Sequence, residues 1–449
     1  MKTSVGGSRH CDKFVGGRYG VSRAVNACLH GTMLRTYSLI ASDGFPPRAC
    51  FQLLQFVNAL EMFVKRFFPF VFCFVFLLCA CNISFGGGGD DEFASAGDLG
   101  FGNGWNLGNT LDACSYGDKA NKGLSTETSW KMPTTTEAMI KAVAARGFKT
   151  IRIPVSWHNH ITDSSYTIDS AWLERVKTVV DWSLNAGMKV IINIHHDNLS
   201  EAQMSTTYGF CVPENNAGLK NQSLLYIKSI WKQVASYFKD YDENLIFEVL
   251  NEPRAVGKSY EWSGSGSQIS NANKIIREYE KAALDEIRSA GGKNDVRFVM
   301  IPPYAASPNM TEGWSLPSDS ASGKLIVSVH AYTPYTFCMD TSTVNTFGSS
   351  QQSDINWLFN SLGKDFTNRG IPVIIGEASA SDKNNLAERK KWFAYYCAKG
   401  RSAGIPIVLW DNMVTVSTGG NINSGECHGY FNRNSLGWFF PTLIDEMVK

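Results

Sequence analysis

The stretch LIFEVLNEPR, residues 245–254, begins as an apolar run typical of a buried strand and ends in Asn251, Glu252 and Pro253. Proline has no backbone N–H to donate to a sheet ladder, so we expect the strand to stop at this proline. An amide and a carboxylate would then stand side by side at the strand's carboxyl end. One strand end is weak evidence, so the other strands of the chain decide what it means.

Seven further short runs rich in Val, Ile and Phe alternate with segments of helical period. This alternation predicts repeated βα units and a parallel sheet. Eight strands in about 350 residues predict an α/β fold, a single (β/α)8 TIM barrel, whose active site is built at the carboxyl ends of the strands. The expected strands are 104–109, 150–157, 189–196, 245–252, 297–304, 325–332, 372–379 and 406–412.

Helical patterns separate most of these strands. The pattern at 134–148 has a Thr and Glu start signal and a Gly stop, and 171–187 also closes on Gly. The connection 305–324 shows no convincing helical pattern. The other expected helices are 219–239, 269–291, 355–370 and 387–404.

The N-terminal part indicates export. Lys65 and Arg66 precede the apolar run 67–80, which has the proportions of a signal-peptide core and is short for a membrane span. The run ends in LLCAC, which resembles the lipobox of bacterial lipoproteins, so we expect a signal peptide over 62–81 and a lipid anchor at Cys81. A plain secretory peptide or a helix anchor are the alternatives. The predicted location is secreted or on a bacterial cell surface.

Two segments flank this signal and precede the barrel. Residues 1–61 show no sustained periodicity, and we expect them to be untranslated or unstructured. Residues 82–98 are rich in Gly, Ser and acidic residues and are expected to form a flexible linker. The predicted catalytic domain is then 99–449.

The formal net charge is +1, from 42 Lys and Arg against 41 Asp and Glu. This balance gives no reason to expect nucleic acid or another polyanion as a partner. The chain has 12 Trp residues, whose flat indole faces can stack on sugar rings, although most tryptophans serve packing. Loop residues Trp130, Trp262 and Trp314 are candidate platforms for outer sugar subsites, with ordinary packing as the alternative. We expect a monomer.

Polar side chains are concentrated at the expected strand ends. Because the carboxyl ends of barrel strands meet at one face, these side chains should surround one cleft. They are Arg152, His195, His196, Asn251, Glu252, His330, Tyr332, Glu377 and Trp410.

Glu252 and Glu377 end different strands and form a pair of carboxylates. Such a pair can hydrolyse a glycosidic bond: one group protonates the leaving oxygen, and the other attacks the anomeric carbon or activates water. One carboxylate must stay ionised, which a nearby cation or hydrogen-bond donor favours. Arg152 and Tyr332 are available for this purpose.

Seven motifs, in order and spacing, resemble the retaining (β/α)8 glycoside hydrolases of family 5, clan A. They are GWNLGNTLDA, RIPVSW, NIHHD, EVLNEPR, VHAYTP, IGEAS and LWDN. The chain is most similar to the endoglucanases and xyloglucanases of the family's fourth subfamily. The resemblance covers the barrel from Gly104 nearly to its end.

By this resemblance, Glu252 is the general acid and base, and Glu377 is the nucleophile that forms a covalent glycosyl-enzyme. Asn251 would bind the sugar 2-hydroxyl, an interaction that strengthens in the transition state. Arg152 and Tyr332 would hold Glu377 charged.

The resemblance also implies that His195 and His196 contact the sugar at subsite −1, that His330 orients the catalytic pair, and that Trp410 forms the floor of that subsite. The implied activity is a retaining endo-β-1,4-glucanase that cleaves cellulose, mixed-linkage glucan or xyloglucan by double displacement. No cofactor and no metal are implied. A β-mannanase of the same fold is an alternative, and the preferred glycan stays open.

The chain departs from the family pattern after the nucleophile. Family members commonly place an aromatic residue there, whereas Glu377 is followed by Ala378 and Ser379. The chemistry needs only the carboxylate, so this departure concerns the shape of the neighbouring subsite.

Two other classes of function are open. His158, His160 and the HHD motif at 195–197 could form the metal site of a metal-dependent barrel hydrolase. A glycan-binding lipoprotein without catalysis is the other alternative, against which both carboxylates argue. His158, His160 and His428 are otherwise expected in loops or behind the residues that contact substrate.

Four cysteines are expected in loops on the catalytic face. An exported protein can keep disulfides, so bridges at the rim of the cleft and reduced thiols are both open, with the pairing unknown. The four are Cys114, Cys211, Cys338 and Cys427, while Cys397 is expected in a helix.

Overall fold

The computed structural model describes residues 95–340 and 344–449. The expected N-terminal extension, the signal peptide with its lipobox and most of the linker lie outside the described residues. Among the described residues, no helix is both long enough and apolar enough to cross a membrane.

Eight parallel strands close into a barrel in chain order. Each lies within one of the expected segments and is shorter than it, so the predicted (β/α)8 barrel is confirmed. The strands are β1 (Gly104–Asn106), β2 (Thr150–Ile153), β3 (Lys189–Asn193), β4 (Leu245–Glu248), β5 (Val299–Ile301), β6 (Leu325–His330), β7 (Val373–Ala378) and β8 (Ile407–Leu409).

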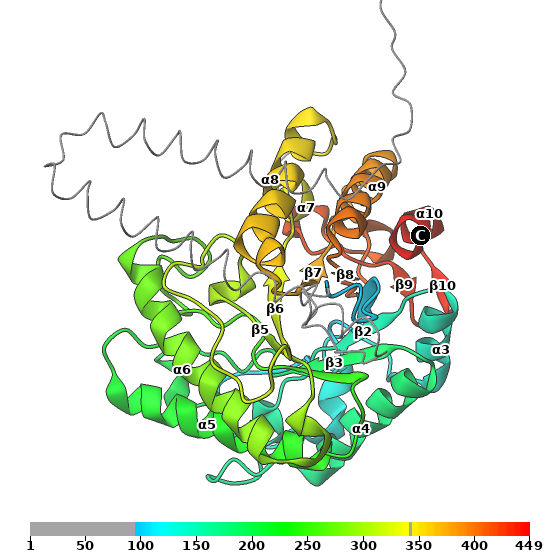
Figure 1. The fold of residues 1–449 in the computed structure, drawn as a ribbon. Helices are drawn as coiled ribbons and strands as arrows, with labels where there is room; N and C mark the ends of the chain where they lie inside the picture. The colour runs from blue at the N-terminus through cyan, green and yellow to red at the C-terminus, as the bar shows by residue number, and fades with distance from the viewer. Residues whose placement is uncertain (1–94, 341–343) are drawn as a thin grey trace, which may run out of the picture. The chain divides into compact units, whose positions relative to one another are not determined.

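Helices form a ring around these strands (Figure 1). Six match the expected helical segments: α3 (Glu137–Ala145), α4 (Ser170–Asn185), α5 (Ala217–Tyr237), α6 (Ser267–Ser289), α8 (Ser349–Asp365) and α9 (Leu386–Ala403). The connection from β5 to β6 holds only the short 3-10 turn Tyr304–Ala306, as the missing helical pattern predicts. The last helix, α10 (Pro441–Val448), packs beside α9.

The prediction that Pro253 stops β4 is wrong. The strand already ends at Glu248, although the N–H of Val249 still donates to the carbonyl of Met300 on β5 (3.1 Å). The next ladder donor would come from Pro302, which has no N–H. The carbonyl of Val249 instead accepts the indole N–H of Trp231 from α5 (2.9 Å). A proline directly after the neighbouring strand β5 therefore ends the ladder.

The barrel interior is layered with the two-residue period of the strands. The lower layer is apolar, and Ala96 and Phe101 close it from below. Its strand members are Ile191, Ile246, Met300, Ile326, Ile374 and Val408. Two residues further along β3, β4 and β6 stand the buried polar side chains Asn193, Glu248 and Ser328. The interior thus changes from apolar to polar toward the carboxyl ends of the strands.

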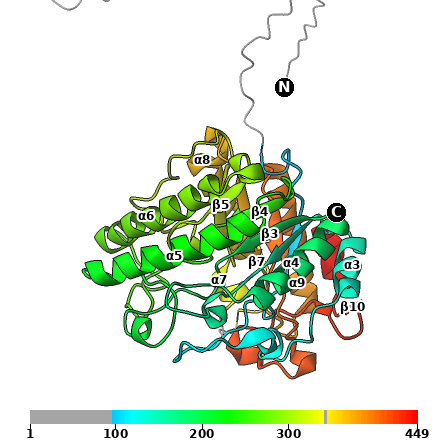
Figure 2. The ribbon, with the colours of Figure 1, turned by 90° about the horizontal axis from the view of Figure 1, so that it is seen from below.

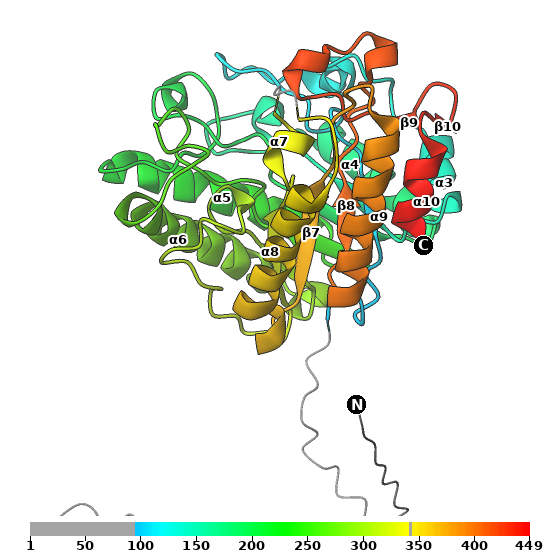
Figure 3. The same cartoon turned by 90° about the horizontal axis from the view of Figure 1, so that it is seen from above.

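Register shifts occur in β6 and β7 at their carboxyl ends. The β6–β7 ladder shifts between Val329 and His330, and the β7–β8 ladder shifts between Ile375 and Ala378. Such bulges re-aim side chains next to active sites. The short helix α7 (Tyr335–Cys338) and the long segment after β8 lie at this same end of the barrel (Figures 2 and 3).

The cysteines of the described residues form no disulfide. All five are free and buried: Cys114, Cys211, Cys338, Cys397 and Cys427. Cys338 ends α7 instead of lying in a loop, and the sulfur of Cys397 contacts the sulfur of Met447 at 3.3 Å. Of the two alternatives left open by the sequence, the structure therefore shows reduced thiols.

Candidate active site

Arg152 lies at the centre of the site, and its side chain is fully buried. Its guanidinium contacts five side chains. Nε donates to Oε2 of Glu248 (2.8 Å), and Nη2 lies 2.7 Å from the same oxygen as an ion pair. Nη1 donates to Oδ1 of Asn106 (3.0 Å) and Oε1 of Glu377 (2.7 Å). Nη2 donates to Oδ1 of Asn251 (2.6 Å) and lies 3.5 Å from Nε2 of His330. Burial opposes the charge on Arg152, but the carboxylates of Glu248 and Glu377 outweigh it and raise the arginine's pKa.

Glu377 has a donor on each carboxylate oxygen. Arg152 binds Oε1, and the hydroxyl of Tyr332 donates to Oε2 at 2.9 Å. Only 5% of Glu377 is exposed. Donors on both oxygens and an adjacent cation favour the ionised form of a carboxylate. Burial and the neighbouring negative charges raise the pKa of Tyr332 well above its usual value, so this phenol stays a donor.

Glu252 faces Glu377 across His330. Nδ1 of His330 lies 2.8 Å from Oε1 of Glu252 and 3.6 Å from Oε2 of Glu377. A carboxylate oxygen of Glu252 and one of Glu377 lie within 4.8 Å of each other. Burial raises the pKa of Glu252, but the hydrogen bond and charge of His330, together with the charges of Arg254 and Arg152, outweigh burial and lower the net pKa. The two carboxylates are therefore close, and different groups hold them.

The amide of Asn251 is oriented by its neighbours. Its backbone N–H donates to the carbonyl of Ile194 (2.9 Å), and its Oδ1 faces Arg152. Among the described residues, Nδ2 of Asn251 has no hydrogen-bond partner. The amide therefore presents an N–H₂ donor that a substrate hydroxyl can use.

The ring of His195, which follows β3, stacks on the ring of Trp410, which follows β8. Their ring centroids are 5.9 Å apart with an interplanar angle of 6°. Gly108 permits this position of Trp410, because a Cβ at Gly108 would come 3.0 Å from the indole and 2.9 Å from the carbonyl of Asp411. Nδ1 of His195 lies 3.1 Å from Nδ2 of Asn193.

The tautomer of His195 follows from Asn193. Oδ1 of Asn193 accepts the N–H of Val155, and Nδ2 donates to Glu248, so the amide orientation is fixed. Nδ1 of His195 must then accept from Nδ2, and its Nε2 carries the hydrogen. Burial, followed by the neighbouring cations, lowers the pKa of His195 well below its usual value, which keeps the ring neutral.

His196 is half-buried and lies beside the aromatic ring of Trp130. Its ring is 5.4 Å from that of Trp130, whose indole N–H donates to the carbonyl of Cys114 (3.2 Å). Nε2 of His196 lies 3.7 Å from Oδ2 of Asp112, and its carbonyl accepts the hydroxyl of Tyr116 (3.1 Å). Trp130 is thus next to a predicted substrate contact.

The other two candidate tryptophans differ. Trp262 is 57% exposed, and the guanidinium of Arg254 lies 4.0 Å from the centroid of its ring. Trp314 instead donates its indole N–H to the buried Glu280 of α6 and meets Phe366 edge to face. Trp314 therefore packs against α6 and Phe366 and is not a platform for a sugar.

The sequence analysis did not identify the buried polar side chains that hold Arg152 in place below the two carboxylates. Asn106, Asn193, Glu248 and Ser328 are fully or almost fully buried and bond to Arg152 or to each other. Strand parity could have found Glu248, because it stands two residues after Ile246 and four before Glu252. The pairing of Asn193 with Glu248 across β3 and β4 depends on register, which the sequence does not give.

The histidines of the alternative metal site do not assemble. Nδ1 of His158 lies 2.6 Å from Asp197, and its Nε2 lies 3.1 Å from the carbonyl of Ser115. His160 stacks on Trp172 with ring centroids 3.6 Å apart. A different cluster, Asp112 with His195 and His196, brings three side chains with ligand atoms together. The fixed tautomer of His195 leaves that ring no free lone pair for a metal.

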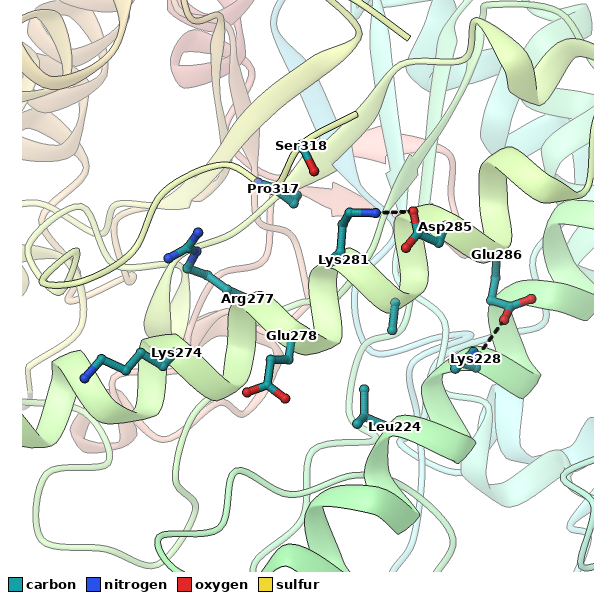
Figure 4. A pocket seen from close by; sticks show the side chains of 11 residues that line it. Leu224, Lys228, Lys274, Arg277, Glu278, Lys281, Asp285, Glu286, Pro317 and Ser318 are labelled. Carbon is teal, nitrogen blue, oxygen red and sulfur yellow. Dashed lines mark hydrogen bonds and ion pairs between the residues drawn. The ribbon is translucent and has the colours of Figure 1, made fainter. Parts of the chain in front are cut away.

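A groove of about 660 Å3 lies between α5 and α6, and none of the nine predicted site residues lines it (Figure 4). Its three carboxylates are paired: Asp285 with Lys281 at 2.5 Å, Glu286 with Lys228 at 3.2 Å and Glu278 with Lys220 at 2.8 Å. The groove therefore offers no pair of carboxylates free for chemistry.

The chain matches a family model described as cellulase (glycosyl hydrolase family 5) over residues 115–415, more than half of its length. Endoglucanase B of Ruminococcus albus is 42% identical over 352 residues, which cover 77% of this chain and 78% of that protein. Endoglucanase A of Clostridium longisporum is 40% identical over 352 residues, covering 77% of this chain and 63% of that protein.

Solved structures of family 5 enzymes are also similar to this chain. A GH5-4 broad specificity endoglucanase from Ruminococcus champanellensis with bound cellotriose superposes with a TM-score of 0.70 at 37% identity, covering 80% of this chain and 99% of that one. A family 5 lichenase from Caldicellulosiruptor sp. F32 in complex with cellotetraose gives 0.70 at 38% identity, covering 77% and 92%.

Proposed function

The chain belongs to glycosyl hydrolase family 5, and we propose that it is a retaining endo-β-1,4-glucanase in which Glu377 is the nucleophile and Glu252 the general acid and base. The observation that carries this proposal is the separation of the two carboxylates, whose nearest oxygens lie within 4.8 Å. Retaining glycosidases hold the two groups about 5–5.5 Å apart, and inverting enzymes about 6.5–9.5 Å, to leave room for water.

In the first step, Oε2 or Oε1 of Glu377 attacks the anomeric carbon while the bond to the leaving oxygen breaks. Glu252 gives its proton to that oxygen, so the leaving chain departs as an alcohol. Arg152 and Tyr332 keep Glu377 ionised and aligned before attack. Nδ2 of Asn251 is available to donate to the sugar 2-hydroxyl.

In the second step, Glu252 is a carboxylate and takes a proton from water. The resulting hydroxide oxygen attacks the anomeric carbon and releases Glu377, so the configuration of the sugar is retained. A general acid must be protonated at the start, although His330 lowers the pKa of Glu252 in the free protein. Substrate that excludes water from the cleft would favour the neutral acid again.

We propose β-1,4-linked glucans as substrates, namely cellulose and mixed-linkage glucan, with xyloglucan as a further candidate. The stack of His195 and Trp410 offers a flat surface for the sugar at subsite −1, and Trp130 and Trp262 are candidates for outer subsites. Product profiles on cellulose, mixed-linkage glucan, xyloglucan and mannan test this assignment, and cleavage of mannan alone would contradict it.

Azide rescue tests the two roles. In Glu377→Ala, azide should replace the missing nucleophile on an aryl β-cellobioside and give the α-glycosyl azide. In Glu252→Ala, the glycosyl-enzyme should form and azide should give the β-glycosyl azide. Wild-type hydrolysis of glucan by either variant would overturn the mechanism.

We further propose that the protein is exported and anchored through a lipid at Cys81. This proposal rests on the apolar run 67–80 and the LLCAC sequence alone. Mass spectrometry of the mature N-terminus distinguishes the outcomes: a diacylated cysteine supports the anchor, and an unmodified N-terminus elsewhere contradicts it.

A further inference from the structure

Glu248 is a fully buried carboxylate that the proposed mechanism does not use. Its Oε2 accepts from Nε of Arg152 (2.8 Å) and from Nδ2 of Asn193 (2.8 Å), and Nη2 of Arg152 lies 2.7 Å from the same oxygen as an ion pair. Its Oε1 accepts from the hydroxyl of Ser328 at 2.5 Å. Both oxygens are surrounded by donors only, which is the environment of an ionised carboxylate.

Arg152 is thus shared between two carboxylates. The Nε and Nη2 edge of its guanidinium is held by Glu248, and the Nη1 tip reaches Glu377. A guanidinium is planar and rigid, so fixing one edge fixes the direction of the other N–H groups. Glu248 therefore aims the donors that meet Glu377 and Asn251.

The charges change during the reaction. When Glu377 becomes a glycosyl ester, it loses its negative charge, but Arg152 stays buried and charged. A buried cation without a partner is strongly unfavourable. Glu248 is the carboxylate that still balances Arg152 at that stage.

We propose that Glu248 is a positioning residue for the double displacement, which orients Arg152 and remains its counter-ion when Glu377 is esterified. This inference rests on the proposed role of Glu377 as the nucleophile. In the free enzyme, Glu248 also offsets part of the positive charge that Arg152 presents to Glu377.

The substitution Glu248→Gln removes the charge and keeps the shape. The amide oxygen can take the place of Oε2 toward Arg152 and Asn193. The amide N–H₂ then faces Ser328, whose hydroxyl can turn to accept. We expect kcat/KM to fall about 100-fold, as when one preorganised electrostatic contact is lost.

The pH profile separates this role from a merely structural one. With Glu248 neutral, Arg152 favours the ionised form of Glu377 more strongly, so the acidic limb of kcat/KM should move to lower pH. Glu377 is also faced by Tyr332, His330, Glu252 and, through its charge, Glu426, none of which the substitution alters. An unmoved acidic limb with near wild-type kcat/KM would overturn the proposal.

Ser328→Ala is the matched control, because it removes one hydrogen bond to Glu248 and leaves the charge. Its acidic limb should stay in place. If Glu248→Gln does not fold, Glu248→Asp tests the positioning role instead. This variant keeps the charge but shortens the side chain, so kcat should fall while the acidic limb of kcat/KM stays in place. Wild-type kcat in Glu248→Asp would contradict the positioning role. Azide rescue of Glu377→Ala, run in parallel, shows whether a negative result concerns Glu248 or the nucleophile itself.

Discussion

Nδ1 of His330 lies 2.8 Å from Oε1 of Glu252, so a neutral imidazole on β6 can donate directly to the proposed acid and base from the segment after β4. Burial opposes the charge on His330, but Glu377 and Glu252 outweigh it and raise its pKa. The same contact lowers the pKa of Glu252 against the effect of burial. The strength of the acid therefore depends on the position of this ring.

His330→Ala should move the alkaline limb of kcat/KM to higher pH. That limb reports the loss of the proton from the acid, and removing His330 removes the main contact that lowers the pKa of Glu252. Arg254 and Arg152 also lower it, so the shift will be partial. The absolute kcat should fall because the pair loses its orientation.

The control for His330 is Tyr332→Phe, which removes a donor to Glu377 and leaves Glu252 untouched. Its kcat should fall by about 10- to 100-fold, the cost of one hydrogen bond to a charged group, with the alkaline limb in place. An alkaline limb that moves to lower pH in His330→Ala would contradict the argument.

Gly108→Ala should impair catalysis without unfolding the barrel. The added Cβ would meet the backbone carbonyl of Asp411 at 2.9 Å, which cannot move freely, and the Trp410 indole at 3.0 Å. The stack of Trp410 on His195 would then be displaced. We expect a raised KM and a lowered kcat on cello-oligosaccharides, with a circular dichroism spectrum like that of the wild type. Gly363→Ala is the matched control, because, like Gly108, it has no positive φ, and the nearest atom to its added Cβ lies at an ordinary 3.8 Å.

EDTA should leave the hydrolysis of glucan unchanged. Both ring nitrogens of His158 are engaged, and the hydrogen bond from Asn193 occupies the lone pair of His195. Initial rates before and after dialysis against the chelator check this prediction. Activity that disappears and returns with zinc would favour the metal-dependent alternative.

The sequence predicted the barrel because βα alternation is a local signal that tertiary contacts reinforce. It also predicted which polar side chains stand toward the carboxyl end of the barrel, where Arg152, Glu252, His330, Tyr332 and Glu377 meet in one cluster. What it could not give depends on register and on neighbouring strands. The end of β4 is set by Pro302, which directly follows β5, and partners of Arg152 come from β1, β4 and β7.

The structure also divides the histidines that the sequence placed together at strand ends. His158, His160 and His428 are buried away from solvent, and the protein holds them in different protonation states. Burial lowers the pKa of His160 and of His428 to about 3. Burial also opposes the charge on His158, but the hydrogen bonds and charges of Asp197 and Cys114 together outweigh it and raise the pKa of His158 to about 10.

These shifts predict that the three histidines give the largest free energy of unfolding near pH 6.5, their ordinary pKa. Below pH 6.5, the unfolded chain binds protons that folded His160 and His428 exclude, so stability falls toward pH 3. Above pH 6.5, folded His158 keeps a proton that the unfolded chain releases, so its stabilisation is lost as pH rises toward 10. Each group contributes a slope of about 1.4 kcal/mol per pH unit.

Two substitutions test the two slopes by urea unfolding at pH 4.5, 6.5 and 8.5. His160→Phe keeps the stack on Trp172 and removes a titrating group, so the loss of stability from pH 6.5 to 4.5 should shrink by about 2–3 kcal/mol relative to the wild type. His158→Gln should be less stable at every pH but should lose the decline between pH 6.5 and 8.5. The difference between each variant and the wild type cancels the carboxylates, which titrate alike in both. If the free energy of unfolding of both variants depends on pH as that of the wild type does, these two histidines do not bind or release protons on unfolding, and the argument is wrong.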